Sequence, residues 1–122
     1  MPNSTQNYLL ANTPLSTICF SGATGTSSVY LNGPGGIAGD GLPMPRRGYL
    51  TGLTLWDGSL VRSDADKISF NSGDRLSVYC QNMGTDFTVK VRLNGVSTTL
   101  QLTAVPHNST LQALVEFMLI RE

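Results

Sequence analysis

The chain has 122 residues, of which 40% are hydrophobic and 13% charged, and its eight basic and eight acidic residues give a formal net charge of zero. A chain of this length forms one domain that buries about two-thirds of its unfolded surface, so it needs neither a disulfide nor a metal to fold. Because there is no excess charge, neither nucleic acid nor an anionic membrane is an expected partner. The low charge also leaves little repulsion between copies, which permits self-association.

The first fourteen residues are polar, lack periodicity and end at Thr13-Pro14. We predict an N-terminal arm over residues 1–14 and a single β-sandwich domain over residues 15–122. The start of the chain has no basic segment followed by an apolar run, so it does not resemble a secretory signal. No stretch reaches the length of a transmembrane helix. We therefore expect the protein to be made and folded in a cytoplasm.

Short strands are expected at residues 16–20 and 27–31, followed by a glycine-rich surface loop between Gly33 and Gly41. Two prolines follow this loop directly, so no helix is expected to start there and offer its N-terminus to a phosphate. The next predicted strand, residues 48–56, contains glycines at positions 48 and 52. Glycines inside a strand indicate a bulge or a close approach of another backbone.

A polar connection is expected over residues 57–66, then a short strand at 67–70, a turn at 71–74 and another strand at 75–81. The clearest signal comes next, where Phe87, Val89, Val91 and Leu93 alternate with polar residues. Asn94-Gly95 follows, and this dipeptide favours a two-residue type I′ turn because both positions tolerate positive φ. The segment around 98–102 repeats the alternation, which predicts a β-hairpin.

The last predicted strand, residues 111–120, is apolar on both faces. Its odd-numbered positions form one apolar face, and its even-numbered positions include Leu114, Met118 and Ile120 as well as polar residues. Helical spacing also fits part of this segment, but the preceding strands need a partner, so we predict a strand. The second apolar set is covered either by a loop or the N-terminal arm, or by another subunit. We favour the subunit interface because the low charge of the chain points the same way.

Strands that recur every 8–12 residues, with Gly, Asn and Pro between them, indicate an all-β antiparallel sandwich or barrel of about eight strands. Cys19 and Cys80 each lie in an apolar run. We expect two core thiols, because unpaired cysteines are among the most buried residues, with a disulfide as the alternative.

Residues with catalytic or metal-binding chemistry are sparse. The single histidine, His107, lies in a loop, no serine has nucleophile-elbow spacing, and Asp64-Ala65-Asp66 is the nearest approach to a calcium site. We therefore expect no enzyme activity and no cofactor. Trp56 beside Asp57 suits a sugar-stacking site, although packing at the end of a strand is the favoured interpretation.

The central and C-terminal parts of the chain resemble small β-sandwich structural proteins of tailed bacteriophages. The resemblance covers roughly residues 38–121 and rests on three segments: Pro43–Leu53 (PMPRRGYLTGL), Phe70–Val78 (FNSGDRLSV) and Val91–Val96 (VRLNGV). It implies a jelly-roll-like fold and a non-enzymatic, usually trimeric virion protein. Such a protein is a capsid decoration (cement) protein or a head- or tail-fibre module.

In a decoration protein, the expected partners are the major capsid protein and other copies of the chain, at the capsid surface of the virion. The resemblance places Leu114, Met118 and Ile120 at the trimer contact. It places residues 2–14 and the Arg46-Arg47 pair against the shell. The arm residues expected to carry this contact are Asn3, Tyr8, Leu9 and Leu10.

The alternative function is a carbohydrate- or receptor-binding module of a fibre. Its site would be a surface that combines Trp56 and Tyr49 with the loop from Gly33 to Gly41.

Overall fold

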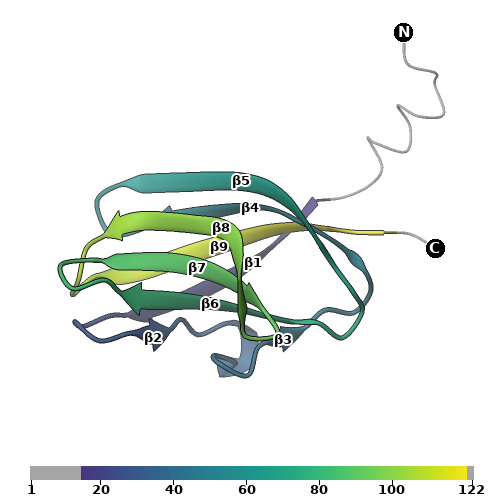
Figure 1. Cartoon of the computed structure of the whole chain (residues 1–122), viewed down its shortest axis with the longest axis horizontal. Helices are drawn as coiled ribbons and strands as arrows, with labels where there is room; N and C mark the ends of the chain where they lie inside the picture. Colours follow the sequence, from purple (N-terminus) through teal and green to yellow (C-terminus); the bar gives the residue numbers. More distant parts are fainter. Residues whose placement is uncertain (1–14, 121–122) are drawn as a thin grey trace, which may run out of the picture.

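The computed structural model describes residues 15–120 as an all-β fold of nine strands and one short 3₁₀ turn (Figure 1). The elements are β1 (Leu15–Ala23), β2 (Val29–Tyr30), η1 (Pro34–Gly36), β3 (Leu42–Pro43), β4 (Gly48–Trp56), β5 (Val61–Phe70), β6 (Arg75–Asn82), β7 (Phe87–Leu93), β8 (Val96–Val105) and β9 (Thr110–Leu119).

The strands form two antiparallel sheets, which confirms the predicted all-β sandwich. One sheet has the order β1-β9-β4-β5; the other has the order β2-β6-β7-β8, with β3 also paired to β6. The jelly-roll arrangement is not confirmed: β4 and β5 pair as a hairpin within one sheet, and β6, β7 and β8 form a meander within the other.

The inward-facing side chains of both sheets meet in one hydrophobic core. Its largest members are completely buried and come from strands of both sheets, which packs the two layers into one unit. They include Phe20, Leu50, Leu55, Leu76, Phe87, Leu100 and Leu111. The two sheets of residues 15–120 therefore share one hydrophobic core.

The strongest local prediction is confirmed at the β7–β8 hairpin. Asn94 has φ 54° and Gly95 has φ 77°, the two positive values that a type I′ turn requires. Phe87, Val89 and Val91 are buried, as the alternation predicts. The last segment is also a strand rather than a helix: β9 lies in the middle of its sheet, between β1 and β4.

Both glycines of β4 behave as the sequence indicates. Gly48 is buried against β9, where an added Cβ would lie 2.0 Å from the Met118 carbonyl oxygen. The β4 register shifts between Leu50 and Gly52, which makes Thr51 the extra residue of a bulge. One glycine therefore allows a close backbone approach and the other lies at a bulge.

The predicted polar connection at residues 57–66 is wrong over most of its length, because β5 begins at Val61. The sequence did not predict this strand because it contains Asp64 and Asp66, and aspartate is uncommon in strands. Both aspartates bond to the edge strand β8. The Asp64 carboxylate accepts a hydrogen bond from the Gln101 backbone N–H at 3.1 Å, and the Asp66 carboxylate accepts one from the Thr99 hydroxyl. On the same strand, Arg62 donates to the carbonyl oxygens of Thr103 and Ala104 at 3.0 and 2.8 Å.

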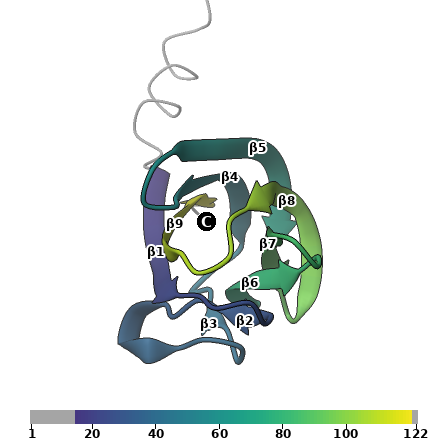
Figure 2. The same ribbon diagram turned by 90° about the vertical axis from the view of Figure 1, so that its left-hand side faces the viewer.

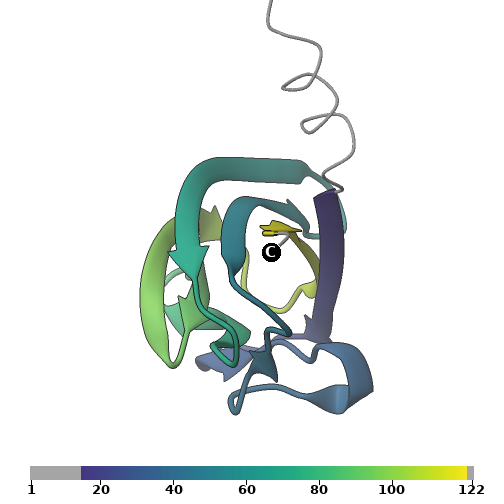
Figure 3. The same cartoon turned by 90° about the vertical axis from the view of Figure 1, so that its right-hand side faces the viewer.

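The two sheets therefore meet along two seams, and the sandwich approaches a closed barrel when viewed end-on (Figures 2 and 3). At the first seam, side chains of β5 satisfy backbone groups of β8. At the second, Ser21 of β1 and Asn32 exchange two backbone hydrogen bonds of 2.8 Å. Sheet edges that would otherwise present unpaired backbone groups are thereby covered.

Candidate functional site

The outward surface of the β1-β9-β4-β5 sheet, which we call the β9 face, carries the residues predicted to contact other subunits. In this register, Leu114 lies between Cys19 of β1 and Thr54 of β4, and Met118 lies between Leu15 and Tyr49. Leu114 is 41% exposed, while Met118 and Ile120 are half-buried. The opposite positions of β9 point inward, where Leu111, Ala113, Val115 and Phe117 are buried.

The part of the β9 face that β1, β9 and β4 form is rich in apolar side chains, whereas β5 at its edge is charged. Glu116 is the only charged residue in strands β1, β4 and β9. Exposed large apolar side chains lie toward both ends of this face: Leu15, which pairs with Met118, is 57% exposed, and Val61, which pairs with Trp56, is 67% exposed. Apolar side chains in this number on one sheet face are typical of a surface that is covered in the assembled protein.

A shallow depression of about 370 Å³ lies in the middle of the β9 face. Its floor is low because Gly52 and Ala65 face each other across β4 and β5 with little or no side chain. The bulge at Thr51 turns its hydroxyl toward Glu116, to which it donates a hydrogen bond of 2.8 Å. Glu116 therefore supplies an oriented carboxylate to the lining of the depression, which also includes Asp64.

The residues predicted to touch a capsid shell are only partly described. Arg46 and Arg47 are exposed on the connection between β3 and β4. The Arg47 carbonyl oxygen accepts a hydrogen bond from the Ile120 N–H at 2.9 Å, so this connection adjoins the end of the β9 face. Asn3, Tyr8, Leu9 and Leu10 lie outside the described residues, as does the whole predicted arm.

The alternative carbohydrate site is not brought together as predicted. Tyr49 and Trp56 lie near opposite ends of β4, separated by roughly 23 Å of strand at 3.3 Å per residue. The Gly33–Gly41 loop packs beside β2 and β3 of the other sheet (Figure 1). Trp56 is 41% exposed, so the expectation that it packs into the core is wrong.

The outward surface of the other sheet carries a cluster that the sequence did not single out, which we call the cationic platform: Tyr30, Tyr79, Lys90 and Arg92. The two tyrosine rings have centroids 4.6 Å apart, and the Arg92 guanidinium lies 4.0 Å from the centre of the Tyr79 ring. Arg92 also donates to the Tyr30 hydroxyl at 2.8 Å and to the Ser97 hydroxyl at 3.1 Å. Its guanidinium is thus held in one orientation.

The glycine-rich loop borders this platform. An added Cβ on Gly39 would lie 3.3 Å from the Tyr30 ring, so the loop backbone packs directly on that tyrosine. With Pro43 and Arg75, the loop lines an open depression of about 620 Å³. The short 3₁₀ turn at Pro34–Gly36 is the only helical turn that the described residues contain.

Asp57, Asp66 and Asp74 accept hydrogen bonds from neighbouring backbone N–H or hydroxyl groups. Asp57 accepts hydrogen bonds from the Leu60 and Ser59 N–H groups at 2.8 and 3.0 Å, which lowers the pKa of its carboxyl. The pKa of Asp66 is lowered chiefly by the Thr99 hydroxyl, and that of Asp74 chiefly by the Asn71 N–H. Within residues 15–120 no three His, Cys, Asp or Glu side chains gather as a metal site.

The two cysteines differ, so the prediction of two core thiols is half wrong. Both are free; Cys80 is buried between the sheets, whereas Cys19 is exposed on the β9 face. The reason is strand phase: Phe20 occupies the inward position of β1, which turns its neighbour Cys19 outward. Burial raises the pKa of the Cys80 thiol to about 12.

We therefore expect one reactive thiol in the native protein. A thiol reagent such as dithionitrobenzoate at pH 8 should modify one cysteine in the unassembled chain and both cysteines in denaturant, because the thiolate is the reacting form. Peptide mapping should place the native modification at Cys19. Rapid modification of Cys80 without denaturant would contradict its burial.

His107 has a structural environment rather than a reactive one. Its Nε2 atom lies 3.0 Å from the Asn82 side-chain oxygen, and its ring packs edge-on against Phe87 with centroids 4.6 Å apart. The Ser109 hydroxyl donates to the His107 carbonyl oxygen at 3.3 Å, and within residues 15–120 no hydroxyl, thiol or carboxylate hydrogen-bonds to the imidazole ring.

None of the helical structure in residues 15–120 is long and apolar enough to cross a membrane. No family model matches the chain, and no match was found among the curated proteins or among the solved structures.

Proposed function

We propose that this chain is a non-enzymatic structural protein that assembles through its β9 face, as a homotrimeric decoration protein on a phage capsid. The observation that carries the proposal is the apolar part of the β9 face on β1, β9 and β4, where Leu15, Leu114 and Met118 face outward and Glu116 is the only charged residue. The phage setting and the trimer rest on the resemblance described above. The mechanism is added buried interface, with no chemical step.

Energetics favours covering this face. Burying one Leu, Val or Met side chain contributes about 1.5–3 kcal/mol relative to leaving it in water. A specific interface needs on the order of 1,000 Å² of buried surface, which several strands of one sheet can supply. On a capsid, each subunit of a trimer makes one weak contact, and because the three contacts are linked, the trimer binds more tightly than a single subunit.

The first test is the native mass of the purified protein by light scattering coupled to size exclusion. We expect a trimer. Leu114→Asp should raise the protein concentration at which the trimer forms by about 10–100-fold, because each contact loses the burial of one leucine side chain. Val96→Asp is the matched control, because Val96 is 68% exposed at the β7–β8 hairpin, away from the β9 face.

Cys19 provides a second readout without any substitution, because it lies beside Leu114 on the β9 face. Its reaction with a thiol reagent should slow as protein concentration rises through the assembly range and should remain fast in Leu114→Asp. A monomer at all concentrations, or equal effects of the Leu114 and Val96 substitutions, would refute assembly through this face.

The capsid role is tested separately by adding the protein to undecorated capsids of the encoding phage and measuring co-sedimentation. Removal of residues 1–14 should weaken attachment while leaving the trimer intact. Full attachment by the shortened protein would overturn the assignment of the arm. No co-sedimentation of the full chain would overturn the decoration role itself.

A further inference from the structure

The cationic platform lies on a sheet without acidic residues. Strands β2, β3, β6, β7 and β8 contain three cationic side chains and no Asp or Glu; the cations are Arg75, Lys90 and Arg92. The other sheet has mixed charges, with Arg62, Lys67, Asp64 and Asp66 on β5 and Glu116 on β9. The strands of this sheet therefore carry only positive charge, and the nearby acidic residues, Asp40, Asp74 and Asp86, are confined to the connections.

Two of these cations stand next to each other on one strand face. Lys90 and Arg92 are two residues apart on β7, which places their Cβ atoms roughly 7 Å apart on the outward side. Lys90 is half-buried, and its ammonium group has no hydrogen-bond or ion-pair partner among the described residues. Like charges this close repel, and an anion bound between them would relieve that repulsion.

Arg92 is oriented before any ligand arrives. Its Nε and one Nη donate to Ser97 and Tyr30, and its plane lies over the Tyr79 ring. These bonds use two of its five N–H groups and fix the rest in space, so a carboxylate can bind without an entropy cost for ordering the side chain. The unpartnered ammonium of Lys90 supplies the second positive charge.

The surroundings suit a sugar better than a protein partner. Four residues paired across β2, β6, β7 and β8 form one row on the outward face: Tyr30, Tyr79, Lys90 and Gln101. The row therefore offers two aromatic rings, one cation and one amide. Such groups contact the C–H faces and hydroxyls of a pyranose ring, whereas protein interfaces have an apolar core. The exposed large apolar residues of this sheet, Met83 and Val96, lie at its turns rather than on the platform.

We propose that the cationic platform is a binding site for an acidic glycan, with the sugar carboxylate between Lys90 and Arg92 and the ring against the tyrosines. The depression lined by the glycine-rich loop, its Asp40 and Arg75 adjoins Tyr30 and extends the site for the hydroxyl groups of a neighbouring sugar unit. This site lies on the sheet opposite to the β9 face, so it stays accessible in an assembled protein and does not depend on the assembly proposal.

The test is a calorimetric titration of the full chain with two carboxylated probes, trigalacturonate and sialyllactose. Their uncharged counterparts, the methyl ester of trigalacturonate and lactose, are titrated in parallel. We expect binding of at least one acidic probe and at least tenfold weaker binding of its uncharged counterpart. Failure of both acidic probes to bind would overturn the proposal.

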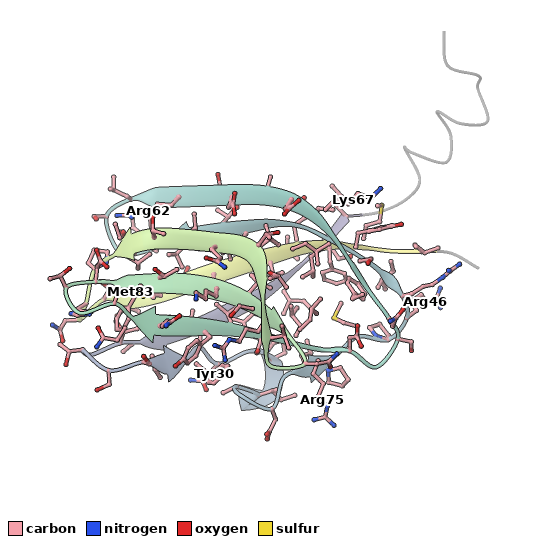
Figure 4. All side chains as sticks on the ribbon, viewed as in Figure 1. Tyr30, Arg46, Arg62, Lys67, Arg75 and Met83 are labelled. Atoms are coloured by element: carbon pink, nitrogen blue, oxygen red, sulfur yellow. The ribbon has the colours of Figure 1, made fainter. Side chains whose placement is uncertain are left out.

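Three variants separate this site from general electrostatics. Lys90→Gln should weaken binding at least tenfold, whereas Lys67→Gln should change it less than twofold. Lys67 is the matched control because it also lies over a tyrosine, 4.4 Å from the Tyr49 ring, but on the other sheet (Figure 4). Arg92→Lys keeps the charge but loses the planar fork, so it too should weaken binding.

Equal effects of Lys90→Gln and Lys67→Gln, or unchanged binding by Arg92→Lys, would overturn the assignment to the platform. A polyglutamate peptide that binds as tightly as the acidic sugars would also overturn it, in favour of an acidic protein partner. The native mass of each variant should match that of the parent chain, which keeps this result separate from the assembly test.

Discussion

Phe20→Ala is expected to cause the largest loss of stability among the substitutions considered, about 3–5 kcal/mol, as for other buried aromatic truncations. The Phe20 ring is completely buried on β1, and an added Cβ on Gly33 would lie 2.6 Å from it. The ring therefore packs directly on the backbone that follows β2. Its removal leaves a cavity beside the two hydrogen bonds that join Ser21 and Asn32.

Chemical denaturation at fixed protein concentration measures this loss, because self-association would otherwise add to the apparent stability. Thr26→Ala, at an exposed position in the connection after β1 and outside the β9 face, is the control and should change stability by less than about 0.5 kcal/mol. Hydrogen exchange adds a local readout: the Ser21 and Asn32 amides should lose protection well before those of the β7–β8 hairpin. Equal loss of protection in both regions would contradict a local role at the seam.

Local patterns in the sequence were sufficient for much of this fold. Asn94-Gly95 predicts its turn because few other residue pairs tolerate two successive positive φ values. The β9 segment predicts its inward and outward faces because strand alternation has a fixed period of two. The two glycines of β4 also predicted a bulge or a close backbone approach, because glycine inside a strand often marks one of these features.

Other features depend on tertiary neighbours that no local pattern contains. The acidic residues of β5 look like loop residues until β8 is placed beside them, where Asp64 and Asp66 bond to its edge. Similarly, Leu42-Pro43 pairs with β6 although proline donates no ladder hydrogen bond, because β3 is a two-residue segment at the side of its sheet.

The cationic platform was missed for the same reason. Tyr30, Tyr79 and Arg92 are far apart in the sequence, and only the pairing of β2, β6 and β7 brings them into contact. One signal was available: Lys90 and Arg92 share the outward face of a strongly alternating strand. Without the neighbouring strands, however, two cations on one face of a strand predict only a face that is exposed to water.

The two sheets present surfaces of different chemistry, and this difference links the two proposals. On β1, β9 and β4 the β9 face is rich in apolar side chains and has Glu116 as its only charged residue, which suits contact with copies of the chain or another protein surface. The cationic platform faces the other way, with oriented polar groups and little exposed apolar area. A protein that assembles through one sheet can therefore display the other to an external ligand.

Gly48→Ala is expected to lower the free energy of unfolding by about 3 kcal/mol, the upper part of the range for overpacking, and to displace the backbone of the β9 face. Its Cβ would meet the Met118 carbonyl oxygen at 2.0 Å, and because this atom belongs to the backbone, no side-chain rotation can relieve the contact. The β4 and β9 strands must separate at this end, which moves Met118 and the adjoining Ile120–Arg47 hydrogen bond.

Gly52→Ala is the matched control, because it adds the same methyl group to the same strand. There the new Cβ would lie 3.6 Å from the Asp64 carbonyl oxygen and 3.8 Å from Glu116, both ordinary contact distances. We expect thermal unfolding to show a clear loss for Gly48→Ala and a change within about 1 kcal/mol for Gly52→Ala, since alanine also loses less backbone entropy than glycine on folding. Equal stability of the two variants would mean that β4 and β9 do not approach each other this closely. Under the assembly proposal, Gly48→Ala should also weaken self-association more than Gly52→Ala, because the backbone that carries Met118 and Ile120 would be displaced.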